Sequence, residues 1–588
     1  MNTKHFNYLY LTLALVVTWC LPLAAKADTQ RVGEPPVRTA SAQAGMVVCE
    51  TELAAQIGAD VLRKGGNAID ASVAVAFALA VTWPEAGNIA GGGFMLIAAP
   101  GQPIEGLDYR EVAPEAATQD LYRSGETRFK AKAVGVPGTV GGLATAHAKF
   151  GQLPWKDLVR PSATLAADGF VVDGDLAASL NYVLTRKNVR ENNEGRHTEF
   201  RRVYTHPDDR PWRVGDTLTL PDLAETLEQI AEEGADAFYH GPIAEDMASH
   251  IQDAGGIITS NDLANYEAVW RTPTHGTFQG FDLYTMAPPS SGGICVPQIM
   301  GMLERRKVTE LERWSPETLH VMAEAMRRSF RDRAAYLGDP DFIEIPAYLL
   351  EDKYLDELAA TIDAEKATLS ASLVGEIELV AESPDTTHFS IVDRNGLAVS
   401  NTYTLEAIYG SRVVIPGRGI LLNNEMGDFN WIKGQTNTKG KIGTDANLIA
   451  PGKRMLSSMS PTIVQRDGRT VLVVGSPGGR TIINTVSQVL LNHLGFEMSL
   501  AESVEVPRLH HQWFPDRIQF ESYFADTHPE LMDALGEMGH ATHIYRSTQG
   551  SVNAIEAQGD GTLVGVADWR RGASAAGVEA VEPVLVAP

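Results

Sequence analysis

The chain has 588 residues, 44% of them hydrophobic, and its 74 acidic residues against 49 basic ones give a formal charge of −25. This excess of acid argues against nucleic acids and anionic membrane surfaces as partners. The three cysteines, Cys20, Cys49 and Cys295, exclude a disulfide-built scaffold and leave one disulfide possible, between the last two.

The first 27 residues have the layout of a secretory signal peptide. Lys4 and His5 precede an apolar stretch over residues 8–23, which is followed by the small-x-small site Ala25-Lys26-Ala27. A membrane anchor is the alternative, but an apolar core of about 16 residues is short for a bilayer span. We therefore expect cleavage after Ala27 and a periplasmic or secreted mature chain.

Four later stretches have the apolar pattern and the end signals of helices. The first ends at Gly65-Gly66, which suits a C-cap, and Asp222 is a candidate N-cap for the third. The second is apolar on all sides, which predicts a buried helix rather than a membrane span. The expected helices are 53–63, 71–83, 223–233 and 317–337.

Strands are expected among these helices, in antiparallel hairpins and without regular βαβ repeats. The triplet Gly91-Gly92-Gly93 leads into the first strand rather than opening a helix, so it does not fit a nucleotide-binding loop. It predicts close backbone packing instead. The expected strands are 94–98, 389–392, 397–404, 462–465 and 470–474.

The composition changes between residues 359 and 385, where Ala, Glu, Thr and Ser dominate and the segment ends in Glu-Ser-Pro-Asp. Such an exposed polar stretch is typical of a boundary and accessible to cleavage. Thr386 and Thr387 follow it at once and open a strand. This placement suggests that the chain is cut here and that Thr386 becomes a new N-terminus.

The turn 393–396 (DRNG) lies between two alternating apolar runs, and Asn-Gly at this place predicts a hairpin. A three-residue loop with a left-handed glycine sets Thr386 opposite Thr404. A two-residue loop shifts the register by one and sets Thr404 opposite Thr387. In both registers a second hydroxyl lies beside the first.

An N-terminal threonine carries its own base. The hydroxyl is a poor nucleophile until its proton is removed, and an α-amine with a reference pKa of about 7.7 to 8.0 can remove it at neutral pH. Attack of the Thr386 hydroxyl on the Asp385 carbonyl would generate this N-terminus. Threonine pairs are common in strands, however, so the pair alone does not establish this chemistry.

Five stretches together resemble the γ-glutamyltranspeptidase family of N-terminal-nucleophile hydrolases. The resemblance implies an α+β fold, an αββα sandwich made from one precursor that is cut into two associated subunits. Residues 28–385 would be the large subunit and 386–588 the small one. The five stretches are LDYREVAP (107–114), TTHFSIVD (386–393), GILLNNEMGDF (419–429), KRMLSSMSPTI (453–463) and VGSPGGR (474–480).

The resemblance also implies catalytic roles. Thr386 would be the nucleophile, first in self-cleavage after Asp385 and then in forming a γ-glutamyl ester. Thr404 matches the threonine that hydrogen-bonds this nucleophile. Gly478 and Gly479 match the pair whose backbone N–H groups form the oxyanion hole; without the resemblance, Pro477-Gly478-Gly479 would be interpreted as a turn.

A second group of residues would bind the head of the substrate. Arg110 resembles the arginine that clamps the α-carboxylate, Ser457 and Ser458 would donate to the same group, and Glu425 and Asp428 would receive the α-ammonium. Taken alone, Arg110 beside its glutamate neighbour is better explained as a surface ion pair, the serines as a loop and Asp428 as a cap of a local turn.

The chain departs from the family pattern at two places. Glu406 stands where well-known members carry an asparagine that helps to hold the substrate, so we expect either altered selectivity or a side chain that points elsewhere. The segment 432–444, which corresponds to a lid loop with a tyrosine in several bacterial members, has no aromatic residue, and Trp431 comes just before it.

Three functions are compatible with these features. The first is a γ-glutamyltransferase and glutathione hydrolase with glutathione-like substrates and amino-acid or peptide acceptors. The second is an acylase of the same fold that cleaves glutaryl side chains, and the third is an unprocessed binding protein for γ-glutamyl compounds. None requires a cofactor or a metal; His510 and His511 are adjacent in a strand and point to opposite faces.

Overall fold

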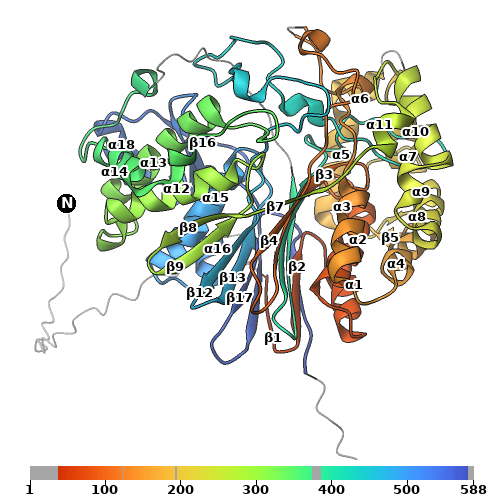
Figure 1. Cartoon of the computed structure of the whole chain (residues 1–588), viewed down its shortest axis with the longest axis horizontal. Coiled ribbons are helices and arrows are strands. Elements are labelled where there is room, and N and C mark those ends of the chain that lie inside the picture. The colour runs from red at the N-terminus through yellow and green to blue at the C-terminus, as the bar shows by residue number, and fades with distance from the viewer. Residues whose placement is uncertain (1–37, 124, 193–194, 374–385, 581–588) are drawn as a thin grey trace, which may run out of the picture. The chain divides into compact units, whose positions relative to one another are not determined.

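The computed structural model describes residues 38–580 except 124, 193–194 and 374–385. The expected signal peptide, Asp385 and residues 374–384 of the polar segment before it lie outside the described residues. Two seven-stranded sheets face each other, with helices on both outer sides (Figure 1). This is the αββα sandwich of the predicted α+β class. Among the described residues, no helix is long and apolar enough to cross a membrane.

The first sheet is antiparallel throughout and has the two strands of the predicted hairpin at its centre. Its order is β19-β2-β10-β11-β3-β4-β7. The strands are β2 (Gly45–Cys49), β3 (Gly92–Ala98), β4 (Glu105–Tyr109), β7 (Val269–Arg271), β10 (Thr387–Asp393), β11 (Ala398–Thr404) and β19 (Ser574–Gly577).

The second sheet is also antiparallel and has the order β1-β18-β17-β13-β12-β9-β8. Its strands are β1 (Arg38–Ala42), β8 (Thr274–Phe278), β9 (Phe281–Thr285), β12 (Thr462–Arg466), β13 (Arg469–Gly475), β17 (Asn553–Ala557) and β18 (Leu563–Ala567). Two small sheets contain β14 (Leu509–His510), β15 (Ile518–Glu521) and β16 (Thr542–Tyr545), and β5 (Phe170–Val171) and β6 (Thr217–Leu218).

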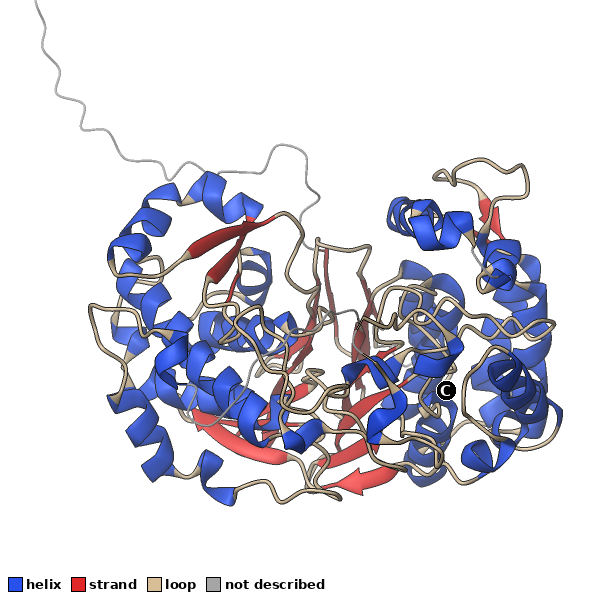
Figure 2. Cartoon of the chain, turned by 90° about the horizontal axis from the view of Figure 1, so that it is seen from above, coloured by secondary structure: helices blue, strands red, loops and turns tan. Residues whose placement is uncertain are grey.

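One group of helices covers the outer face of the first sheet, as Figures 1 and 2 show, and shares a hydrophobic core with it. Side chains such as Val47, Phe389 and Tyr403 belong to this core. The helices are α1 (Glu52–Arg63), α2 (Ala68–Thr82), α3 (Thr139–Phe150), α4 (Trp155–Asp168), α5 (Gly174–Thr185), α6 (Lys187–Glu191), α7 (Thr198–Tyr204), α8 (Pro221–Glu233), α9 (Asp236–Tyr239), α10 (Pro242–Asp253) and α11 (Ser260–Ala264).

The remaining helices pack on the outer face of the second sheet. Their core continues between the sheets, where Met46, Val48 and Phe94 of the first sheet meet Val473 of the second. The helices are α12 (Gly292–Arg305), α13 (Pro316–Tyr336), α14 (Asp352–Ala360), α15 (Thr481–Leu490), α16 (Leu500–Glu505), α17 (Ser522–Thr527) and α18 (Pro529–Glu537).

All four expected helices and all five expected strands are present, with ends that differ by no more than three residues. The predicted capping role of Asp222 is wrong: α8 begins at Pro221, whose fixed φ suits the first helical position, so Asp222 lies inside the first turn. Cys49 and Cys295 are both free and buried, so the disulfide left open by the sequence does not form.

The hairpin has the register of the three-residue loop. Thr387 pairs with Tyr403, and Gly396 in the loop has a φ of 82°, the left-handed conformation that the prediction required. Continued by one residue, this register sets Thr386 opposite Thr404. The close packing expected at the glycine triplet is also present, because a Cβ on Gly91 would lie 1.9 Å from the Thr404 carbonyl oxygen.

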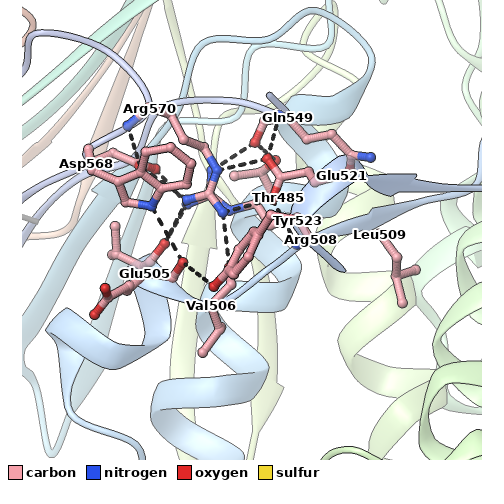
Figure 3. A network of polar contacts seen from close by, with 12 residues as sticks. Thr485, Glu505, Val506, Arg508, Leu509, Glu521, Tyr523, Gln549, Asp568 and Arg570 are labelled. Atoms are coloured by element: carbon pink, nitrogen blue, oxygen red, sulfur yellow. Dashed lines mark hydrogen bonds and ion pairs between the residues drawn. The ribbon is translucent and has the colours of Figure 1, made fainter. Parts of the chain in front are cut away.

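A buried ionic network joins the segment that follows β18 to the small sheet that contains β14 and β15 (Figure 3). The Arg570 guanidinium makes two 2.7 Å hydrogen bonds to the Glu521 carboxylate and one of 3.1 Å to Asp568. Asp568 also accepts from Arg508 at 2.6 Å. The next residue, Arg571, donates to the Thr386 carbonyl oxygen at 3.2 Å, so the network fixes a contact with the start of β10.

We expect Arg570→Met to lower the free energy of unfolding by about 3 to 5 kcal/mol, because it leaves two buried carboxylates without their shared cation. Urea denaturation followed by circular dichroism measures the loss. Arg469→Met removes an exposed arginine of β13 and is the matched control, with an expected change below about 0.5 kcal/mol. Equal losses in the two variants would contradict a stabilising role of the network.

Candidate active site

One cross-strand row of the first sheet organises the site. Thr387 pairs with Tyr403, Tyr403 with Gly93, and Gly93 with Tyr109. One step further along the same strands lie Thr404 and Gly92, which also pair. Arg110 follows Tyr109 at the end of this further row, and Thr386 lies at its beginning.

Side-chain alternation directs this further row toward the second sheet. Tyr403 and Tyr109 belong to the core under the helices, so neighbours one residue away project to the opposite face. Continued by one residue beyond β10 and β4, this alternation directs Thr386, Thr404 and Arg110 to the face between the sheets. Adjacent strands are about 4.8 Å apart, which puts about 14 Å between the backbones of Thr386 and Arg110.

Arg110 is fully buried and is surrounded by three carboxylates. Its guanidinium lies 2.7 Å from Glu425, 2.6 Å from Asp428 and 3.3 Å from Glu111. Glu425 and Asp428 come from one turn of 3-10 helix, η7 (Glu425–Asp428), which places both carboxylates on the same side of the arginine. The structure thus brings together three of the residues predicted to hold a substrate head.

Burial and mutual repulsion shift the charges of this cluster. Desolvation raises the pKa of Glu425 well above its usual value and that of Glu111 to about 8, although Arg110 opposes both shifts. Burial lowers the pKa of Arg110, but the carboxylates around it more than offset this, so the guanidinium stays charged. A cluster with more carboxylates than cations favours the entry of an ammonium group.

The two predicted serines, Ser457 and Ser458, lie in the segment that precedes β12, shortly after a residue that contacts Arg110. Arg110 Nε donates to the Met455 carbonyl oxygen at 3.4 Å. Arg333 of α13 donates to the Ser458 hydroxyl at 3.0 Å and to the Ser291 hydroxyl at 2.9 Å. Ser291 in turn donates to the Ser457 carbonyl oxygen at 2.6 Å, so both serines are held in place.

The predicted oxyanion glycines follow β13. Gly475, the last residue of that strand, lies so close to β10 that a Cβ on it would be 2.2 Å from the His388 ring. Gly478 and Gly479 have φ values of 126° and 56°, and α15 begins two residues later. Their turn therefore lies at the same end of the sheets as Thr386, with backbone amides near a helix N-terminus.

Glu406 is buried and lies in the turn after β11, where it has a φ of 80°. Its backbone N–H donates to the Thr404 hydroxyl at 2.9 Å. Its carboxylate is bound by the guanidinium of Arg128 and by the side-chain amide of Asn424. Glu406 therefore connects the turn that carries Thr404 with the segment that carries Glu425.

The sequence model of the Gamma-glutamyltranspeptidase family matches residues 54–578. The chain belongs to this family.

Close relatives support the same assignment. The glutathione hydrolase proenzyme of Escherichia coli strain K12 is 42% identical over 543 residues, 91% of each chain. That of Pseudomonas aeruginosa is 44% identical over 533 residues, 88% of this chain and 92% of the relative. The crystal structure of cephalosporin acylase from Bacillus halodurans has a TM-score of 0.82 at 25% identity and covers 96% of this chain and 100% of its own. The αββα sandwich is thus the N-terminal-nucleophile hydrolase fold of the family.

Two residues at the family site, Arg128 and Arg333, were not predicted. Neither belongs to the five motifs, and each reaches the site through a contact with a distant part of the chain. A weak signal exists for Arg333, because the predicted helix 317–337 carries charged residues on every side. Several of these are buried: Glu324, Arg327, Arg328, Asp332 and Arg333.

The segment 432–444 is an irregular loop anchored near the glycines of this family site. Arg480 donates to the Gly440 carbonyl oxygen at 3.1 Å. Trp431, which precedes the loop, stacks on Tyr122 with ring centroids 4.0 Å apart and donates to the Met426 carbonyl oxygen at 2.6 Å. The aromatic ring before the loop thus supports the turn that carries Glu425.

A group of possible metal ligands lies elsewhere. Within the described part of the chain, His320, Glu324 and His540 bring ligand atoms within 4.8 Å of one another. Arg327 and Arg328 already bind the Glu324 carboxylate at 3.1 and 2.5 Å. His320 and His540 are joined to each other at 2.8 Å. These contacts explain the group as a buried hydrogen-bonded cluster.

Proposed function

We propose that this family member is a γ-glutamyltransferase and glutathione hydrolase whose nucleophile is Thr386. The observation that carries the proposal is the register of the first sheet, which, continued by one residue at β10 and β4, sets Thr386, Thr404 and Arg110 in one row. The side chain of Arg110 and the chain of a γ-glutamyl group together span the separation of about 14 Å between the two strands.

The first reaction is self-cleavage. The Thr386 hydroxyl attacks the Asp385 carbonyl carbon, and the C–N bond between the two residues breaks to give an ester and a free α-amine. Water then hydrolyses the ester. The products are a large subunit, 28–385, and a small subunit, 386–588, which remain associated because both sheets contain strands from each part.

The second reaction uses the amine that the first one frees. The amine takes the proton of the Thr386 hydroxyl, whose oxygen bonds to the γ-carbonyl carbon of the donor. The N–H groups of Gly478 and Gly479 stabilise the oxyanion, and the Thr404 hydroxyl hydrogen-bonds the nucleophile. When the intermediate collapses, the C–N bond breaks and the leaving amine takes the proton. Water or an acceptor amine then attacks the γ-glutamyl ester.

The charged groups of the donor head replace the ion pairs within the Arg110 cluster. Its α-carboxylate binds Arg110 and the hydroxyls of Ser457 and Ser458, while its α-ammonium binds Glu425 and Asp428. Without substrate these carboxylates bind Arg110 themselves, so the donor head replaces ion pairs that already exist in the site. The substrates are glutathione-like and the acceptors are amino acids or peptides, outside the cytoplasm if residues 1–27 direct secretion.

An acylase that acts on glutaryl amides is the second candidate, favoured by the structural similarity to the cephalosporin acylase. The two candidates differ in the α-ammonium. A glutaryl anilide has no α-ammonium and would leave Glu425 and Asp428 without a partner. We therefore expect kcat/KM for a γ-glutamyl anilide to exceed that for a glutaryl anilide by at least about 100-fold. Steady-state kinetics measures the ratio.

The state of the chain is measured on the same preparation. A denaturing gel is expected to show two bands, and N-terminal sequencing of the smaller one is expected to begin Thr-Thr-His-Phe. Equal turnover of the two anilides would favour the acylase. A single unbroken band with no turnover would favour the binding protein.

A further inference from the structure

The buried ion pair between Arg128 and Glu406 lies at the one substrate-site position where the chain departs from the family motif. The side chain of Glu406 is 2% exposed, whereas that of Arg128 is 21% exposed. Arg128 therefore reaches in from the surface and covers the carboxylate. It comes from the large-subunit part of the chain, 278 positions before its partner.

Arg128 also covers the turn that carries the ammonium-binding carboxylates. A Cβ on Gly427, between Glu425 and Asp428, would lie 3.4 Å from Arg128 Nη1 and 3.5 Å from its Cζ. The guanidinium thus lies against this turn and contacts Glu406 at the same time.

The charges around the site show what the pair does. Arg110 faces three carboxylates, and a fourth, that of Glu406, accepts from the side-chain amide of Asn424, the residue next to Glu425. With Arg128 in place, the fourth carboxylate is neutralised by its own cation. Without it, the site would gain an uncompensated negative charge near the place of the donor head.

We propose that Arg128 is a specificity-determining residue of the γ-glutamyl site. By holding and neutralising the Glu406 carboxylate, Arg128 matches the site to donors whose head carries both an ammonium and a carboxylate. The inference rests on the proposed function. It assigns Arg128 a positioning role, since it acts through Glu406, and leaves the chemistry at Thr386 unchanged.

The test varies the charge of the donor head. Arg128→Gln is assayed with three anilides: γ-glutamyl (zwitterionic head), glutaryl (anionic) and 4-aminobutyryl (cationic). We expect kcat/KM for the glutaryl donor to fall about tenfold relative to that for the 4-aminobutyryl donor, because the freed carboxylate repels the anion and attracts the cation. For the γ-glutamyl donor we expect a higher KM, with kcat within about threefold of wild type.

Three further variants separate electrostatics from structure. Arg128→Lys keeps the charge and is expected to keep the wild-type ratio between donors. The double variant Arg128→Gln/Glu406→Asn removes both charges and is expected to restore that ratio. Arg123→Gln removes an exposed arginine of the same segment and is the matched control, with no expected change.

Two outcomes would overturn the inference. One is a decrease of kcat/KM in Arg128→Gln that is equal for all three donors and is not reversed in the double variant. The other is an unchanged ratio in Arg128→Gln. Failure of the proposed function looks different, because the wild-type chain would then not turn over the γ-glutamyl anilide at all.

Discussion

Thr386→Ala is expected to remain a single polypeptide and to lose at least about three orders of magnitude of γ-glutamyl turnover. Both losses have one cause, since the hydroxyl that attacks the Asp385 carbonyl is the hydroxyl that later attacks the donor. The uncut chain also lacks the α-amine that acts as base. A denaturing gel measures the first loss and release of the anilide chromophore the second.

The neighbouring threonine is the natural control. Thr387 belongs to β10, is buried, and its hydroxyl has no hydrogen-bond partner among the described residues. Thr387→Val removes this hydroxyl at nearly constant volume, so we expect cleavage and turnover to be retained. Thr386→Ser keeps a hydroxyl and is expected to be cut, more slowly. If Thr387→Val remained uncut while Thr386→Ala was cut normally, the nucleophile would be Thr387 and not Thr386.

The central hairpin was predictable to within one residue of register because its turn obeys a local rule. Asn395-Gly396 offers few loop conformations, and the left-handed glycine selects the register that sets Thr386 opposite Thr404. The alternation of apolar residues predicted the two flanking strands by a similarly local rule. The prediction that Asp222 caps α8 was wrong because the residue before it, Pro221, already occupies the first helical position.

The site was predictable only in its motif residues. Arg110, Glu425 and Asp428 come together as the family resemblance implies, although Arg110 and Asp428 are 318 positions apart. Arg333 reaches Ser458 across 125 positions and Arg128 reaches Glu406 across 278, and no motif contains either arginine. Contacts of this kind depend on how two sheets and their helices pack, which short patterns do not encode.

Arg110→Lys is expected to lower kcat/KM for γ-glutamyl donors by about 100-fold or more and to leave self-cleavage intact. Lysine keeps one positive charge among the carboxylates, but it lacks the planar fork that makes two parallel bonds to an α-carboxylate. Self-cleavage does not involve an α-carboxylate. The expected protein is therefore cut into two subunits and nearly inactive.

A donor without the α-carboxylate and a second arginine that binds carboxylates complete this test. The 4-aminobutyryl anilide lacks the group that Arg110 would bind, so its low turnover in the wild type is expected to change little in Arg110→Lys. Arg271 binds Asp108 and Asp341 at 2.7 Å from the neighbouring strand β7, and Arg271→Lys is expected to leave the ratio between the two donors unchanged. If Arg110→Lys lowered the turnover of both donors equally, the arginine would serve only to hold its three carboxylates together. The α-carboxylate would then have to be bound by the serines alone, which two neutral hydroxyl groups do weakly against so many nearby negative charges.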